Sequence, residues 1–94
     1  MTFEEFLAVD PDRAEAMSPE LRALALDRAG RWQEAHDLAD KAGTPETQRV
    51  HGYLHRKNGE LSNARYWYEQ LGETMLDGPP DEEWSALVRR FLVG

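Results

Sequence analysis

Cysteine is absent from this sequence, which excludes disulfide bonds and thiolate metal sites. A small domain that does without disulfides suits a reducing compartment, so we expect the protein in the cytoplasm. Long apolar runs are also missing, since none approaches the roughly 20 residues of a membrane-spanning helix. The first residues include Glu4 and Glu5, whereas a secretion signal begins with basic residues. We therefore expect no association with a membrane.

Positive charge is scarce, because 11 Lys and Arg residues stand against 18 Asp and Glu residues and leave a net charge of −7. Nucleic-acid binding depends on Lys and Arg that neutralise phosphates, so this balance argues against nucleic acid as a partner. β-branched residues are few and scattered, with no sustained alternation of apolar and polar positions, so no segment is expected to form a strand. We expect residues 1–94 to form a single all-α domain.

Prolines and glycines are few, and most of them stand where helices are expected to begin or end. Ser18-Pro19 and Thr44-Pro45 each place a capping hydroxyl before a proline that suits the first helical position. Glycines that follow apolar helical stretches predict helix ends. The expected helices span residues 3–9, 18–30, 31–42, 44–58, 61–71 and 81–92, and for residues 10–17 a helical turn is one alternative.

A short internal repeat joins the four central helices in pairs. Residues 30–35 and 59–64 align with an offset of 59 − 30 = 29. In each, a glycine ends a helix, a large apolar residue follows two positions later, and an alanine follows three positions after that. This pattern resembles the turn of the tetratricopeptide repeat, although that repeat has a period of about 34 residues and a longer connection. Gly52 and Tyr68 also fall where that repeat favours a small residue and an aromatic one.

The resemblance implies two stacked antiparallel helical hairpins with short N-terminal and C-terminal capping helices. Two repeats alone leave apolar faces exposed, so caps are required. The C-terminal stripe, expected to cover the open end of the second hairpin, consists of Trp84, Leu87, Val88 and Phe91. The N-terminal stripe, expected at the other end, consists of Phe3, Phe6 and Leu7. The tryptophans expected in the core are Trp32, Trp67 and Trp84.

Several segments resemble a family of short, uncharacterised, mostly bacterial helical proteins. The resemblance covers about residues 18 to 92, and its segments are residues 18–24, 32–36, 51–60, 63–68 and 83–84. It implies that the chain is a complete small protein, and it implies no particular chemistry.

All three histidines lie in or beside the repeat. His51 and His55 are four residues apart and therefore project from one side of their helix. His36 and Asp40 have the same spacing on the preceding helix. Because the second helix of one hairpin neighbours the first helix of the next, we expect these four side chains to converge.

Three interpretations of this cluster remain open. His36, His51 and His55 have the residue type and spacing to bind zinc or a similar ion, with a carboxylate completing the shell. Alternatively, the histidines are half-buried hydrogen-bonding side chains that order the helix interface, or they bind a non-metal ligand. A glutamate between His51 and His55 would indicate a metalloprotease, but this segment reads Gly-Tyr-Leu. The leading expectation is no cofactor.

Arg56, Asn63 and Tyr66 form a second candidate cluster. Arg56 has the spacing to pair with Glu60, and Asn63 has the position to bridge a turn. Turn stabilisation is one interpretation, and contact with a peptide or a small anion is the other.

The repeat-like architecture favours an interaction module that binds an unknown protein or peptide, by analogy of fold. The alternative is a small-molecule or metal-binding protein, with enzymatic activity as one version of it, centred on His36, His51 and His55. A homodimer is a third interpretation. No residue is predicted to be catalytic, and the sequence leans away from an enzyme.

Overall fold

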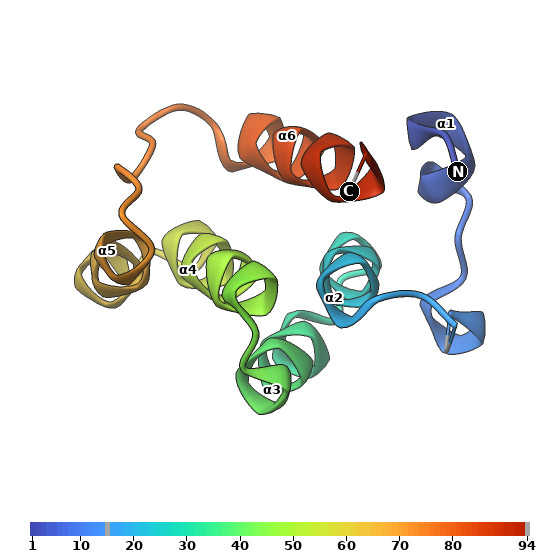
Figure 1. Ribbon diagram of the computed structural model, residues 1–94, viewed down its shortest axis with the longest axis horizontal. Coiled ribbons are helices and arrows are strands. Elements are labelled where there is room, and N and C mark those ends of the chain that lie inside the picture. The colour runs from blue at the N-terminus through green and yellow to red at the C-terminus, as the bar shows by residue number, and fades with distance from the viewer. Residues whose placement is uncertain (15, 94) are drawn as a thin grey trace.

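The computed structural model describes residues 1–14 and 16–93, which form helices and no strand (Figure 1). The predicted all-α class is confirmed. The elements are α1 (Phe3–Leu7), the 3-10 helix η1 (Pro11–Arg13), α2 (Pro19–Arg28), α3 (Trp32–Ala42), α4 (Pro45–Lys57), α5 (Leu61–Gln70) and α6 (Pro80–Val93). Among the described residues, every helix is too short or too polar to traverse a lipid bilayer.

The prolines begin helices as predicted, but only some of the expected caps form. Thr44 precedes α4, and its hydroxyl accepts a hydrogen bond of 3.1 Å from the amide of Thr47. Thr47 returns the contact by accepting from the Thr44 amide at 2.9 Å, so the two residues satisfy each other. Ser18 is the N-cap residue of α2, as predicted, but its hydroxyl accepts no hydrogen bond from the first turn of that helix, whose residues are all described. Helix α6 begins at Pro80, one residue before its predicted start.

Gly30 and Gly59 form equivalent turns. Both have φ of +80°, in the left-handed region that glycine adopts without steric cost. After Gly30, the amide of Arg31 donates to the carbonyl of Leu26 at 3.0 Å, and after Gly59 the amide of Glu60 donates to the carbonyl of His55 at 2.9 Å. Each turn is therefore a Schellman cap. The caps fold α3 back against α2 and α5 back against α4.

Small residues let α4 and α5 approach closely. A Cβ atom placed on Gly52 would lie 3.1 Å from Cβ of Trp67 and 3.2 Å from the ring of Tyr68. Ala64 of α5 and the equivalent Ala35 of α3 are fully buried. The alanines of the internal repeat thus occupy equivalent interior positions in the two helix pairs.

Helix α6 packs against α2 and α4, the first helix of each pair, and α1 packs against α6 (Figure 1). Trp84 fills this junction: the ring of Phe6 stacks on it at 5.9 Å, the ring of Phe3 meets it edge-on at 6.1 Å, and its indole donates to the Leu24 carbonyl at 2.9 Å. The two terminal helices therefore meet each other and do not cap opposite ends. At 14 residues, α6 is slightly longer than the helix predicted for residues 81–92.

Candidate metal centre

Three imidazoles meet between α3 and α4, which lie side by side in Figure 1. His36 projects from α3, and His51 and His55 lie one turn apart on α4. The ring centroids are 4.6 Å apart for His36 and His51, 5.0 Å for His36 and His55, and 4.7 Å for His51 and His55. One nitrogen of each ring lies within 4.8 Å of the nitrogens offered by the other two.

The apolar pattern of the two helices fixes this meeting point. Ala35 in α3, and Val50 and Leu54 in α4, are completely buried. Each histidine is the next residue along the chain, so it stands about 100° around the helix from the buried stripe. Packing of the apolar stripes therefore brings the histidines together at the edge of the α3–α4 interface.

Two carboxylates contact the outer nitrogens of the cluster. Nδ1 of His55 lies 3.2 Å from Glu60 Oε1, and Nδ1 of His36 lies 3.3 Å from Asp37 Oδ1. An ionised carboxylate only accepts, so Nδ1 carries the hydrogen in both contacts, and in the neutral tautomer that makes this contact Nε2 has a free lone pair. Hydrogen bonds from Asn58 to Glu60 and from Gln33 to Asp37, together with these histidine contacts, lower the pKa of both carboxyl groups. The carboxylates therefore stay ionised at neutral pH and orient the imidazoles.

His51 completes the cluster as a neutral side chain. Its Nε2 lies 2.9 Å from Nε2 of His55, which requires one of these nitrogens to carry a hydrogen when no metal is bound. The pKa of His51 is lowered to about 4, mainly because the side chain is buried and also because of His36 and His55, while the charge of Asp40 opposes the shift. Neutral imidazole is the form that ligates a metal ion.

Two tryptophans flank the imidazoles. Of the three tryptophans predicted in the core, Trp84 is buried there, Trp32 is half-buried and packs against it, and Trp67 is half-buried. Trp32 stacks on His36 with centroids 5.1 Å apart, and its indole nitrogen donates to the Leu54 carbonyl at 3.0 Å. Trp67 of α5 stacks on His51 at 4.5 Å. Both indoles are only half-buried, so they form the walls of the cluster and not its core.

Asn63 and Tyr66 reach the cluster only through Trp67. Oδ1 of Asn63 accepts a hydrogen bond of 3.1 Å from the Trp67 indole, and the ring of Tyr66 meets Trp67 edge-on at 5.2 Å. Tyr66 is 54% exposed. Asp40 is also exposed and lies outside the group of converging ligand atoms, although its charge acts on His51.

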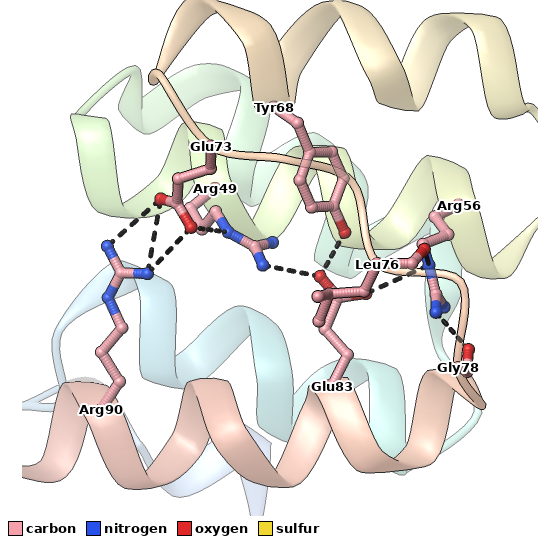
Figure 2. Close-up of polar contacts among 8 residues, drawn as sticks. All are labelled: Arg49, Arg56, Tyr68, Glu73, Leu76, Gly78, Glu83 and Arg90. Atoms are coloured by element: carbon pink, nitrogen blue, oxygen red, sulfur yellow. Dashed lines mark hydrogen bonds and ion pairs between the residues drawn. The ribbon is translucent and has the colours of Figure 1, made fainter.

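The side chain of Arg56 points toward α6 and the segment that precedes it (Figure 2). Its Nε donates to the Leu76 carbonyl at 2.7 Å and lies 3.5 Å from Glu83 Oε1, and its Nη2 donates to the Gly78 carbonyl. Glu60, its predicted partner, contacts His55 instead. Arg56 therefore holds the segment before α6 in place and does not share the histidine site.

Glu83 is the centre of that separate polar network (Figure 2). Its side chain is 1% exposed, and its Oε2 lies 2.8 Å from Arg49 Nη2 and accepts a hydrogen bond from the Tyr68 hydroxyl. Arg49 also donates to Glu73 at 3.0 Å, and Glu73 accepts from Arg90. The network joins α4, α5 and α6.

Sequence spacing identifies some of the residues around the histidines and not others. Trp32 and His36 are four residues apart on one helix face, a pairing that the sequence shows directly. Glu60 and Trp67 reach the histidines only because the Gly59 turn folds α5 back along α4, so spacing alone does not identify them.

Comparisons of this chain with protein-family models, with curated proteins and with solved structures find no match.

Proposed function

We propose that this protein binds one divalent transition-metal ion of the zinc class through His36, His51 and His55. The observation that carries the proposal is the convergence of three imidazole nitrogens, all within 4.8 Å of one another. A tetrahedral zinc ion with Zn–N bonds of about 2.0–2.1 Å separates its ligand nitrogens by about 3.3 Å. The 2.9 Å contact between His51 Nε2 and His55 Nε2 lies close to that separation, and metal binding requires the nitrogens that lie further apart, up to 4.8 Å, to move closer together.

The donor set also defines the class of metal. Imidazole nitrogen suits zinc, nickel, copper and cobalt, whereas magnesium and calcium prefer oxygen ligands. A carboxylate on the Nδ1 atom of a ligating histidine is a common outer contact in metal proteins, where it fixes the tautomer and raises ligand basicity. Glu60 and Asp37 make this contact with His55 and His36.

Packing without a metal is the competing explanation, and it accounts for part of the cluster. A hydrogen bond from His51 Nε2 to His55 Nε2, followed by one from His55 Nδ1 to Glu60, satisfies two of the three imidazoles. It gives no role to Nε2 of His36, whose ring packs nearly perpendicular to both other histidine rings. A shared metal ion uses all three nitrogens.

Thermal unfolding with EDTA and with added zinc tests the proposal. A bound ion stabilises the folded state by mass action, so zinc is expected to raise the Tm of the chain as its concentration increases. The His36→Gln variant removes a ligand from the partly exposed position and should lose most of this rise. Lys41→Gln, at an exposed position of the same helix, is the matched control and should keep it.

Two results would overturn the metal proposal. One is an identical Tm in EDTA and in zinc. The other is an equal zinc-dependent rise in the original chain and in His36→Gln, which would place any bound metal elsewhere.

We also propose that the two helix pairs are divergent tetratricopeptide-like hairpins stacked on each other. The matching Schellman caps after Gly30 and Gly59 support this, as do the buried alanines Ala35 and Ala64. Binding of a protein or peptide remains a prediction of that fold analogy. A pull-down from native lysate that recovers no specific partner would count against it, and light scattering against the 10.8 kDa monomer tests the homodimer alternative.

A further inference from the structure

We infer that a metal ion held by these three histidines keeps an exchangeable fourth position that takes water, hydroxide or a small monoanion. This inference rests on the proposed metal site and concerns its ligand chemistry. A zinc-class ion takes four ligands, and sites with three protein ligands keep the fourth place for solvent or substrate. In the described part of the chain, the group of mutually close ligand atoms consists of the three histidines alone.

The two neighbouring carboxylates, Glu60 and Asp37, already make hydrogen bonds to the Nδ1 atoms of the imidazoles and to side-chain amides. Glu60 contacts Nδ1 of His55 and accepts a hydrogen bond of 2.8 Å from Asn58. Asp37 likewise contacts Nδ1 of His36 and accepts one of 2.9 Å from Gln33. Because Nδ1 and Nε2 lie on different edges of the ring, these carboxylates orient the ligands from outside the cluster.

The cluster reaches solvent at His36. The side chain of His36 is 21% exposed, against 8% for that of His55. His51 is buried and is covered on one side by the stacked ring of Trp67. An incoming ligand therefore has access from the His36 side, beside the stacked rings of Trp32 and Trp67.

The charge of the metal ion and its three histidine ligands determines which class of molecule suits the fourth position. Three neutral imidazoles bring no negative charge into direct contact with the ion, since Glu60 and Asp37 lie behind the rings, and this favours an anionic fourth ligand and lowers the pKa of a bound water. Small monoanions such as azide, and hydroxide formed from that water, meet this charge requirement. Asp40 is the competing occupant, since it is exposed on α3 and its charge already acts on His51.

Cobalt(II) reports the fourth position directly, because its visible absorption bands change when a ligand is exchanged. The chain and its Asp40→Asn variant are loaded with cobalt, freed of excess metal, and titrated with sodium azide. We expect a saturable change in the cobalt bands, with the same midpoint in both proteins. His36→Gln, treated in the same way, is the blank for cobalt bound elsewhere.

The outcomes separate this inference from the proposed function. Failure of the chain to retain cobalt overturns both the metal site and the open position. Retained cobalt with bands that azide does not change in either protein overturns the open position alone. A response seen only in Asp40→Asn also overturns it, because Asp40 would then be the fourth ligand.

Discussion

At the scale of single residues, Glu60 determines which nitrogen of His55 faces the other imidazoles. Replacing it with alanine removes the acceptor at Nδ1 and frees the ring to change tautomer and to rotate. We expect Glu60→Ala to weaken zinc binding by about 10-fold or more, the usual effect of losing such an outer contact. Isothermal titration calorimetry measures the change.

Glu69→Ala, at an exposed position of α5, is the control for this substitution and should bind zinc as the original chain does. Equal affinity in Glu60→Ala and in the original chain would show that Glu60 does not position the ligand.

Protonation of His51 links folding to pH in the metal-free protein. Its pKa is lowered to about 4 in the folded chain, whereas the unfolded chain keeps the ordinary value near 6.5. Between these values the unfolded state binds more protons, so the free energy of unfolding falls as the pH is lowered through this window. The loss is on the order of 3 kcal/mol.

Urea unfolding in EDTA across that window measures the effect, with His51→Gln as the comparison. Carboxyl groups titrate at the lower end of the window in both proteins, so the informative quantity is the difference between the two slopes. A variant whose stability depends on pH as steeply as that of the original chain would contradict the assignment to His51.

The sequence identified the inner residues of the site better than the outer ones. The spacing of His51 and His55, together with their place beside buried Val50 and Leu54, follows directly from helical periodicity. Arg56 shows the limit of that reasoning. Its partner at the same spacing is Glu60, yet it binds carbonyls of the 76–78 segment, whose course no local pattern specifies.

At the scale of helices, prolines and glycines predicted where the helices begin and end, because both residue types act on the local backbone. Pro19 and Pro45 fix φ at the first helical position, and Gly30 and Gly59 supply left-handed caps. Packing between helices was less predictable. The C-terminal stripe was recognised from its periodicity, but the choice of α2 and α4 as its partners depends on shape across the whole molecule.

The close contact of α4 with α5 gives a test at Gly52. Alanine at a helix interior is intrinsically favoured over glycine by about 1 kcal/mol. At this site the added methyl group would lie 3.1 Å from Cβ of Trp67, a backbone-proximal atom that yields only if the helices separate. We expect Gly52→Ala to destabilise the protein by about 1–3 kcal/mol, the cost of overpacking.

Chemical denaturation in urea measures this change in stability, and Ser62→Ala at an exposed position of α5 serves as the control. If Gly52→Ala stabilises the protein, helix propensity outweighs packing, and the close approach of the two helices is not needed for the fold.

At the scale of the whole molecule, the buried network around Glu83 attaches α6 to α4 and α5. Neutralising one member leaves the remaining charges buried with fewer partners, which costs more than the intact pair contributes. We expect Glu83→Gln to destabilise the chain by about 3–5 kcal/mol. The neighbouring Glu82→Gln is exposed and should change stability by less than about 0.5 kcal/mol.

A second variant keeps this test informative if Glu83→Gln unfolds the protein. Tyr68→Phe removes only the hydroxyl that donates to Glu83, and we expect it to cost about 1–2 kcal/mol. Combined with Glu83→Gln, its cost should shrink, because residues of one network couple and their effects do not add. Two outcomes would contradict this role of the charges: fully additive costs in the double variant, or the same urea midpoint for Glu82→Gln and Glu83→Gln. Either would mean that apolar contacts such as those of Trp84 hold α6 in place without help from the charges. In that case the apolar side chains of the C-terminal stripe, and not the buried carboxylate of Glu83, would determine where α6 packs.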